Sequence, residues 1–238
     1  MEKLLYPVWK KESQSIAEFR QLLLGSVSEK LLASGVLKLR WSIIDEDVEP
    51  AKGLRQQNIQ PSMDAMLTLW LDSSVFRAEQ ETIIAAAVET FHGYLVTESE
   101  SIVNTKHPAV EGQRTYGMNE VVFLQRPERL TYEQWLDIWH NSHTQIAIDT
   151  QSTFGYRQNV VTRKLTEAGP EIAAIIEENF PPEAMTSQHA FYDAYTEDGD
   201  EDDARKDANL KAMIDSVVRF IDFDKIDVMP TSEYLIKA

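Results

Sequence analysis

The feature that most constrains the fold of this chain is a pattern that occurs twice, with an offset of about 116 positions. Residues Leu5–Phe19 read LYPVWKKESQSIAEF, and residues Val121–Trp135 read VVFLQRPERLTYEQW. Each segment is an apolar strand, a charged turn, a Ser/Thr-x-x-Glu/Gln capping box (Ser15–Glu18, Thr131–Gln134) and an aromatic residue. A capping box satisfies the free N–H groups at a helix start, and the aromatic residue begins the buried stripe of that helix. The repeated pattern predicts two halves built to the same plan.

Both halves continue with the elements of one supersecondary motif. In the first half we predict strands and one further helix by hydrophobic periodicity, at Val36–Ile44, Ala65–Leu71, Glu79–Phe91 (the helix) and Tyr94–Val103. In the second half the corresponding elements are predicted at Phe154–Val161, Ala190–Tyr195, Leu210–Ile221 (the helix) and Glu233–Ile236. Each half therefore reads β-α-β-β-α-β, which is the ferredoxin-like arrangement.

The predicted fold class is α+β, with two fused ferredoxin-like repeats whose sheets form one pseudo-dimeric α/β barrel. Residues 1–104 make the first repeat and residues 118–238 the second. The linker, residues 105–117, contains a His-Pro step and two glycines, which are loop signals. An open alternative is that each half pairs with a half of another chain, so that the barrel is built by a homodimer.

Two segments lie outside the repeated pattern. Asp45–Met63 is a polar connector with two prolines. Lys164–Gln188 is longer, and we predict a short helix in it at Glu171–Glu178, closed by Asn179–Pro182. Loops of this length that carry their own structure often cover a binding site. A surface insertion is the alternative interpretation.

Composition excludes several classes of function. The chain has no cysteine, which removes disulfides, thiolate metal sites and cysteine nucleophiles. Its formal net charge of −16 argues against binding to a phosphate backbone, which requires a basic surface. No apolar run reaches membrane-spanning length, and the first residues lack the apolar core of a signal peptide. We therefore expect a cytoplasmic protein whose partner is a small organic molecule rather than nucleic acid or membrane.

The second half also carries a family resemblance. Trp139 and His143 stand at Trp-x-x-x-His spacing on the predicted helix, and the following strand contains Tyr156–Asn159, reading YRQN. With the preceding Leu124–Pro127, these residues resemble the EthD family, a branch of the dimeric α/β barrel superfamily. Family members often have a proline shortly after the helix histidine, where this chain has Thr144 and a glutamine. The resemblance implies oxidative or polyketide-type chemistry on a small hydrophobic or aromatic molecule.

The candidate catalytic residues are the two histidines of that helix. On a helical wheel His143 falls inside the apolar arc with Trp135 and Trp139, and His140 lies at the edge of this arc. Burial can move the pKa of a histidine into a range useful for acid–base catalysis, with His143 as general acid or base and His140 assisting. A core histidine bonded to its neighbours explains the pattern equally well. The pair could also form half of a metal site, but no third ligand completes it, and we expect no metal.

The candidate substrate-binding residues come from the predicted strands and from the helix. Arg40, Arg157 and Asn159 alternate with helix-facing residues, so they would line the barrel interior and grip an oxygen of the ligand. Tyr156 and Trp139 would supply aromatic walls. The alternatives are strands that face solvent at a sheet edge, and aromatic residues that only pack the core.

Further motifs limit the chemistry. The acidic run Glu197–Asp203 lacks the spacing of a calcium loop and is interpreted as a solvated turn that caps a helix. Phosphate-binding glycine loops and dinucleotide fingerprints are absent from the sequence, so we expect no organic cofactor. The leading hypothesis is an enzyme that uses His143. The alternatives are a non-catalytic accessory protein that binds a small ligand for an oxygenase, and a barrel filled by its own side chains.

Overall fold

The structure is a computed structural model that describes residues 1–58 and 62–238, and it has mixed α and β secondary structure. The strands are β1 (Glu2–Trp9), β2 (Lys38–Ile43), β3 (Gln56–Gln57), β4 (Ala65–Leu71), β5 (Thr90–Phe91), β6 (Tyr94–Ile102), β7 (Gln113–Arg114), β8 (Met118–Leu124), β9 (Gly155–Lys164), β10 (Ala174–Phe180) and β11 (Ile226–Lys237). The helices are α1 (Ile16–Leu22), η1 (Leu23–Val27), α2 (Ser28–Ala33), η2 (Glu46–Leu54), η3 (Ser74–Phe76), α3 (Ala78–Ala87), α4 (Tyr132–Ile138), η4 (Trp139–His143), α5 (Thr144–Thr150), η5 (Pro182–Met185), α6 (Gln188–Phe191), α7 (Asp203–Val217) and η6 (Phe223–Lys225).

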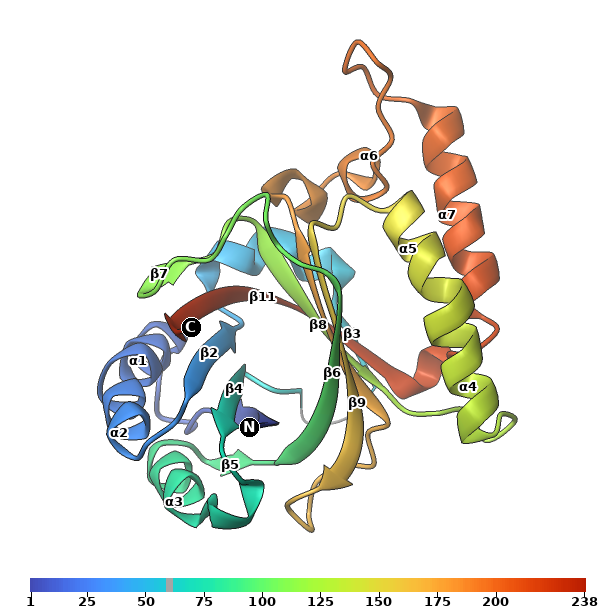
Figure 1. Cartoon of the computed structure of the whole chain (residues 1–238). Coiled ribbons are helices and arrows are strands. Elements are labelled where there is room, and N and C mark those ends of the chain that lie inside the picture. Colours follow the sequence, from blue (N-terminus) through green and yellow to red (C-terminus); the bar gives the residue numbers. More distant parts are fainter. Residues whose placement is uncertain (59–61) are drawn as a thin grey trace.

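Eight of the strands close into one antiparallel barrel. Their order is β2-β4-β1-β6-β9-β10-β8-β11, and β11 pairs back to β2. The two seams between the halves are β6 with β9 and β11 with β2, and both form within this single chain. Figure 1 shows α1, α2 and α3 outside one side of the barrel and α4, α5 and α7 outside the opposite side. A second chain is therefore not needed to complete the sheet.

Both halves order their strands in the same way. In each half the second strand is followed across the sheet by the third, the first and the fourth, β2-β4-β1-β6 and β9-β10-β8-β11. Both predicted capping boxes are present, on Ser15 and on Thr131. The helix after each box contains a π-helical segment, η1 in the first half and η4 in the second, at the same offset as the boxes. The two halves thus share an irregular π-helical turn that helix propensities alone do not predict.

Two of the predicted elements in the second half were wrong. Glu171–Glu178 was predicted as a helix, but residues 174–180 form strand β10, which pairs with both β8 and β9. Ala190–Tyr195 was predicted as a strand, but α6 ends there, at Phe191. The sequence AIIEENF looks helical because of its two glutamates. Both faces of β10 are buried, however, so tertiary context outweighs the local preference.

The loops outside the pattern carry structure of their own. The connector at residues 45–63 contains η2 and the short strand β3, and its residues 59–61 lie outside the described residues. The linker at residues 105–117 contains β7, which pairs with β11. In the acidic turn, the Asp202 carboxylate accepts a hydrogen bond from the N–H of Arg205 and caps α7, as predicted. None of the described helices is long and apolar enough to cross a membrane.

Candidate functional site

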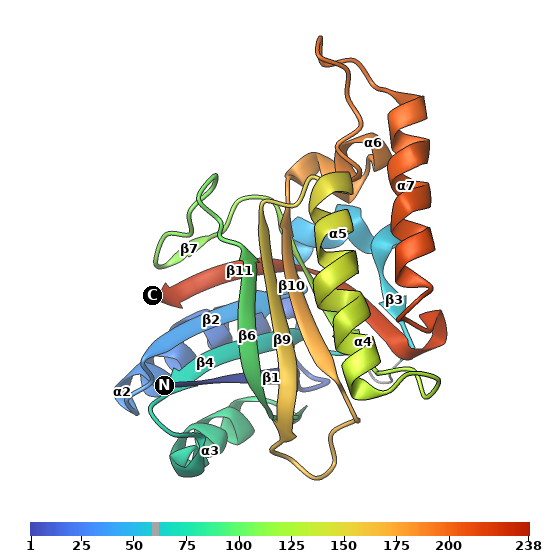
Figure 2. The same ribbon diagram turned by 45° about the vertical axis from the view of Figure 1, so that its right-hand side comes forward.

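The second half contains a cavity of about 610 Å³ between the outer face of its sheet and its helices. The floor is formed by outward-facing residues of β8, β10 and β11, and one wall by α7. Residues 50–54 of η2 and residues 184–192 around α6 line the remaining sides. Figure 2 shows α5 beside β10, with α7 on the other side of α5. Of residues 164–188, which were predicted to cover a binding site, residues 184–188 line one side of this cavity, and Ala168, Pro170 and Ile172 line a second cavity of about 300 Å³.

Most side chains of the cavity wall are apolar, and among the described residues the wall includes no lysine or arginine. Ile176, Met213, Val217 and Phe220 are typical members of the wall. A cavity of this size with an apolar wall and a few polar groups suits a small organic ligand. The polar groups that matter are two glutamates, one histidine and two tyrosines.

The two glutamates, Glu120 on β8 and Glu178 on β10, are direct cross-strand partners. Their exposed fractions are 5% and 9%. Neither carboxyl group has a hydrogen bond or ion pair to any described residue. Burial raises the pKa of Glu120 to about 8, with the charge of Glu178 adding to the effect, and burial raises the pKa of Glu178 to about 7. Two carboxyl groups without a cationic partner therefore face the cavity. Burial lets each of them keep its proton up to a pH near 7.

His143 comes from the π-helical segment η4 and lies 7% exposed at the cavity wall. Its Nδ1 atom is 3.0 Å from the Oγ atom of Ser216 on α7, and its ring packs 4.7 Å from that of Phe220. Burial lowers the pKa of His143 to about 4, and the nearby charge of Arg219 acts in the same direction. The imidazole is therefore neutral at pH 7, and its Nε2 atom has no hydrogen bond to a described residue.

Tyr156 shares this cavity, but its hydroxyl group is already engaged. It accepts hydrogen bonds from the indole of Trp139 at 3.2 Å and from the amide of Gln158 at 3.0 Å, and Thr144 lies within hydrogen-bonding range. Burial raises the pKa of Tyr156, so it stays a neutral phenol. Tyr156 therefore presents its ring to the cavity. Trp139 is fully buried behind it and does not line the cavity.

His140 does not join His143 at the cavity. Its ring packs 4.6 Å from Trp139, it is half-buried, and it is not among the lining residues. The π-helical turn is wider than an α-helical one, so residues three apart separate around the axis instead of sharing a face. The helical wheel, which assumes α-helical geometry, could not show this separation.

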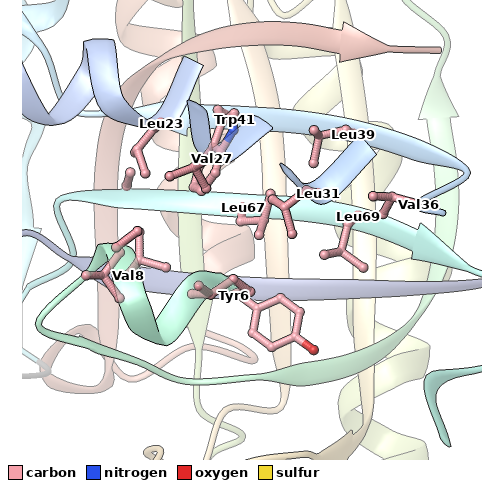
Figure 3. Packing of buried hydrophobic residues seen from close by; sticks show 14 of the residues in the cluster. Tyr6, Val8, Leu23, Val27, Leu31, Val36, Leu39, Trp41, Leu67 and Leu69 are labelled. Atoms are coloured by element: carbon pink, nitrogen blue, oxygen red, sulfur yellow. The ribbon is translucent and has the colours of Figure 1, made fainter. Parts of the chain in front are cut away.

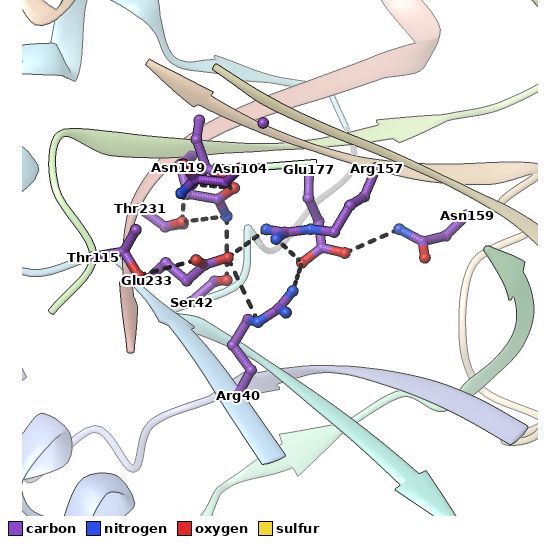
Figure 4. A network of polar contacts seen from close by, with 12 residues as sticks. Arg40, Ser42, Asn104, Thr115, Asn119, Arg157, Asn159, Glu177, Thr231 and Glu233 are labelled. Atoms are coloured by element: carbon purple, nitrogen blue, oxygen red, sulfur yellow. Dashed lines mark hydrogen bonds and ion pairs between the residues drawn. The ribbon is translucent and has the colours of Figure 1, made fainter. Parts of the chain in front are cut away.

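Arg40, Arg157 and Asn159 lie inside the barrel, on the opposite face of the sheet from the cavity. Asn159 donates to Glu177 at 3.1 Å, and Arg157 is hydrogen-bonded to Glu233. Arg40 lies 3.6 Å from each of these two carboxylates. Figure 4 shows the three predicted residues converging on the two glutamates. The predicted inward direction of these side chains is confirmed, but their partners are the protein's own carboxylates.

This barrel network is matched in charge. Lys3 donates to Glu177 at 2.8 Å and also pairs with Glu98. Burial disfavours a charge on Glu177, but Lys3, Arg157 and Arg40 outweigh it and lower the pKa of that carboxyl well below its usual range. The network therefore stays ionised, and several of its buried atoms, including Nε of Arg157 and Oε1 of Glu177, have no hydrogen-bond partner among the described residues. The structure divides the predicted site, leaving His143 and Tyr156 at the cavity and Arg40, Arg157 and Asn159 in the barrel.

In the first half, the space between sheet and helices is occupied by an apolar cluster (Figure 3). Leu4 and Leu69 are cross-strand partners on β1 and β4, and both are fully buried in it. Leu4 stands at the repeat offset from Glu120, and Val27 at the offset from His143. The polar groups of the cavity therefore have apolar counterparts in the first half.

Glu120 and Glu178 were not predicted from the sequence. A signal was present, because Glu120 interrupts the apolar strand MNEVVFL. Glu178 was placed at the end of the helix predicted at Glu171–Glu178, so its position on a buried strand was missed. Pairing the two required the β8–β10 register, which only the structure supplies.

Among the described residues no group of three or more histidine, aspartate or glutamate side chains is placed to hold a metal ion. His143 lines the cavity, whereas His140 packs against Trp139 and does not line it, so the two imidazoles do not share a site there.

No protein-family model and no curated protein sequence matches this chain. Solved structures with related shape include an anthrone oxidase-like protein, with 12% identity over 99% of this chain and 92% of that one and a TM-score of 0.49. A candidate monooxygenase from Fusobacterium nucleatum has 9% identity over the same shares and a TM-score of 0.49. A candidate chlorite dismutase has 11% identity over 100% and 96% and a TM-score of 0.47. TM-scores below 0.5 support no conclusion about this chain, and the resemblance to the EthD family stays a prediction.

Proposed function

We propose that the cavity of the second half binds a small, largely apolar or aromatic molecule and catalyses proton transfer on it. The observation that supports this most is the buried, cation-free pair Glu120 and Glu178 at the wall of a 610 Å³ cavity. Unpaired carboxyls are costly inside a protein and are kept where chemistry uses them. The reaction class is general acid–base catalysis without an organic cofactor, in oxidative or polyketide-type metabolism.

His143 is the histidine that takes part in this proposal. Its Nδ1 atom is fixed by Ser216, so its Nε2 atom is free to bond to an oxygen of the ligand. Because its pKa is lowered to about 4, the ring works as a neutral hydrogen-bonding group toward the ligand. Tyr156 contributes its ring as an aromatic wall. His140 has no direct role in this arrangement.

The fold-level part of the proposal concerns the origin of the two halves. We infer that residues 1–104 and 118–238 are fused ferredoxin-like repeats joined by residues 105–117, and that the chain is EthD-like in its second half. The identical strand order, the two capping boxes and the two π-helical segments at one offset support this inference. One repeat then supplies the scaffold and the other supplies the site.

A thermal-shift screen with neutral aromatic ketones and phenols tests ligand binding. At a hundredfold excess over Kd, a ligand should raise the melting temperature by roughly 5 to 10 °C for a chain of this size. The matched control is Val217→Trp, which places a large ring in the cavity from α7 and should abolish the shift. Failure of every compound to shift the wild-type protein, or equal shifts in the control, would contradict the proposal.

Turnover is tested separately with His143→Ala on any compound that binds. Loss of a positioned hydrogen-bonding group should lower kcat about a hundredfold while binding is retained. Chemically unchanged ligand after prolonged incubation with the wild-type protein would instead favour a binder that holds the molecule for a partner oxygenase. The mostly apolar wall and the engaged hydroxyl of Tyr156 are compatible with that second candidate.

A further inference from the structure

The arrangement of the two cavity glutamates defines a substrate class more narrowly than the cavity does. Glu120 and Glu178 are directly opposite each other on adjacent antiparallel strands, and their side chains leave the same face of the sheet. Cross-strand partners have Cβ atoms about 5 Å apart. Two carboxyl groups at that spacing can reach neighbouring atoms of one bound molecule from the same wall.

The surroundings of this pair exclude the commonest roles of two buried acids that lie side by side. A metal would need further ligands, and no group of three such side chains occurs among the described residues. An ion pair would need a lysine or arginine, and the described lining has neither. A buried cross-strand pair at this place in the sheet does not need to be acidic, because the corresponding pair in the first half is Leu4 and Leu69. The remaining use for the pair is with a ligand.

We propose that Glu120 and Glu178 form an acid–base pair that enolises a neutral, apolar ketone bound in the cavity. This inference rests on the proposed function and names its substrate class. One carboxyl group acts as the base and the other as the acid, with the carbonyl group and its neighbouring C–H bond held between them. Anionic substrates are excluded because two acids and no cation face the ligand.

The proton-transfer step balances without any other reagent. The Glu178 carboxylate takes a proton from the carbon beside the carbonyl, and the electron pair of that C–H bond becomes the new C=C bond. The carbonyl oxygen takes the negative charge and receives the proton of the Glu120 carboxyl group. Glu178 ends protonated and Glu120 ionised, and the product is an enol. If the proton on Glu178 is replaced by one from solvent before it returns to the same carbon, that hydrogen is exchanged, and return to another carbon isomerises the molecule.

The protonation states required for this step agree with the surroundings of the pair. The pKa values of about 8 for Glu120 and about 7 for Glu178 leave an acid beside a base between these two values. The other titratable groups at the wall are His143, Tyr156 and Tyr192, and all three are neutral at that pH. Arg219 approaches His143 from outside, but it does not line the cavity.

The test uses the full chain and β-tetralone, an apolar ketone with acidic C–H groups, in D₂O. Proton NMR follows the exchange of those hydrogens for deuterium, and thermal shift measures binding of β-tetralone and of tetralin, which lacks the carbonyl. We expect the wild-type protein to accelerate exchange above buffer, Glu178→Gln to lose at least about a hundredfold of that rate, and Glu120→Gln to be slowed by a smaller factor. Glu100→Gln, at an exposed position of β6, is the matched control and should exchange like the wild type.

The outcomes separate this inference from the proposed function. Binding of both compounds without accelerated exchange, or exchange that survives both glutamine substitutions, overturns the enolisation while ligand binding stands. Failure of both β-tetralone and tetralin to bind overturns the inference, and failure of every compound in the thermal-shift screen overturns the proposed function as well. A double variant, Glu120→Leu with Glu178→Leu, guards against misfolding because it installs the residues of the first half. It should bind tetralin and show no exchange, and exchange by this variant would also overturn the inference.

Discussion

The two halves of this protein place different side chains in the same layer between sheet and helices. In the first half, Leu4 and Leu69 face each other across β1 and β4 and are fully buried in an apolar cluster. In the second half, Glu120 and Glu178 face each other across β8 and β10 at a cavity. The halves share strand order, capping boxes and π-helical segments. The scaffold therefore does not require acids at these positions.

This difference separates the residues that serve the fold from those that serve the site. Positions that are apolar and buried in both halves serve the fold. Leu23 and Trp139 are one such pair, because both are buried residues of the π-helical segments. Positions that change from apolar to ionisable serve the cavity. The change from Val27 to His143 belongs to this second group. Exchanging residues between the halves tests this division directly.

The largest effect is expected when an acid is moved into the first half. Leu69→Glu places a carboxyl group in a packed apolar cluster without a cavity or a partner. We expect it to lower the free energy of unfolding by about 4 kcal/mol or more, which chemical denaturation would measure. The control is Leu69→Met, a volume-conserving change that should cost less than about 1.5 kcal/mol. If Leu69→Glu lowered the free energy of unfolding no more than Leu69→Met, the first half would also accommodate a buried acid. The difference between the halves would then not mark a functional site.

A smaller effect of opposite sign is expected when the leucines are moved into the second half. Glu120→Leu with Glu178→Leu removes two unpaired buried carboxyls, so the double variant should be more stable than the wild type by about 1 to 3 kcal/mol at pH 7. Denaturant unfolding of both proteins measures the difference. Strong destabilisation of the double variant would mean that the two glutamates stabilise the fold, which contradicts their proposed role in the cavity.

The pH dependence of that difference follows from the raised pKa values. Both carboxyls hold their protons more tightly in the folded chain, at about 8 and about 7, than in the unfolded chain, at 4.5. Their contribution to stability is present below the unfolded pKa and is lost as the pH rises through the folded values, from about pH 5 to about pH 8. The wild type should weaken over this window relative to the double variant. Parallel curves for the two proteins would contradict the raised pKa values.

Much of the fold could be predicted from the sequence because its signals are local. The capping boxes at Ser15 and Thr131, the strand at Ala65–Leu71 and the alternation of Arg157 with Tyr156 all depend on residues close in the chain, and the structure contains them. Strand β10 was missed because its two buried glutamates make it look like an exposed helix. Its burial depends on β8 and β9, which no local pattern records.

The site could be predicted only in part for the same reason. His143 was found from helical periodicity, and it does line the cavity. Arg40 and Arg157 were correctly predicted to point inward, but their ion pairs with Glu177 and Glu233 depend on the closure of the barrel. His140 was placed with His143 on an α-helical wheel, and the π-helical segment separates them. Partners that come from distant strands were beyond the reach of a single sequence.

The central claim is that two carboxyl groups at the cavity keep their protons near neutral pH without a cationic partner. Carbon NMR of the full chain with carboxyl-labelled glutamate measures this directly, with Glu120→Gln and Glu178→Gln assigning the two signals. We predict two glutamate carboxyls that titrate with apparent pKa values of about 7 and about 8 as a coupled pair. If both signals titrate near the ordinary value of 4.5, the carboxyls are solvated or paired, and the account of the cavity is wrong.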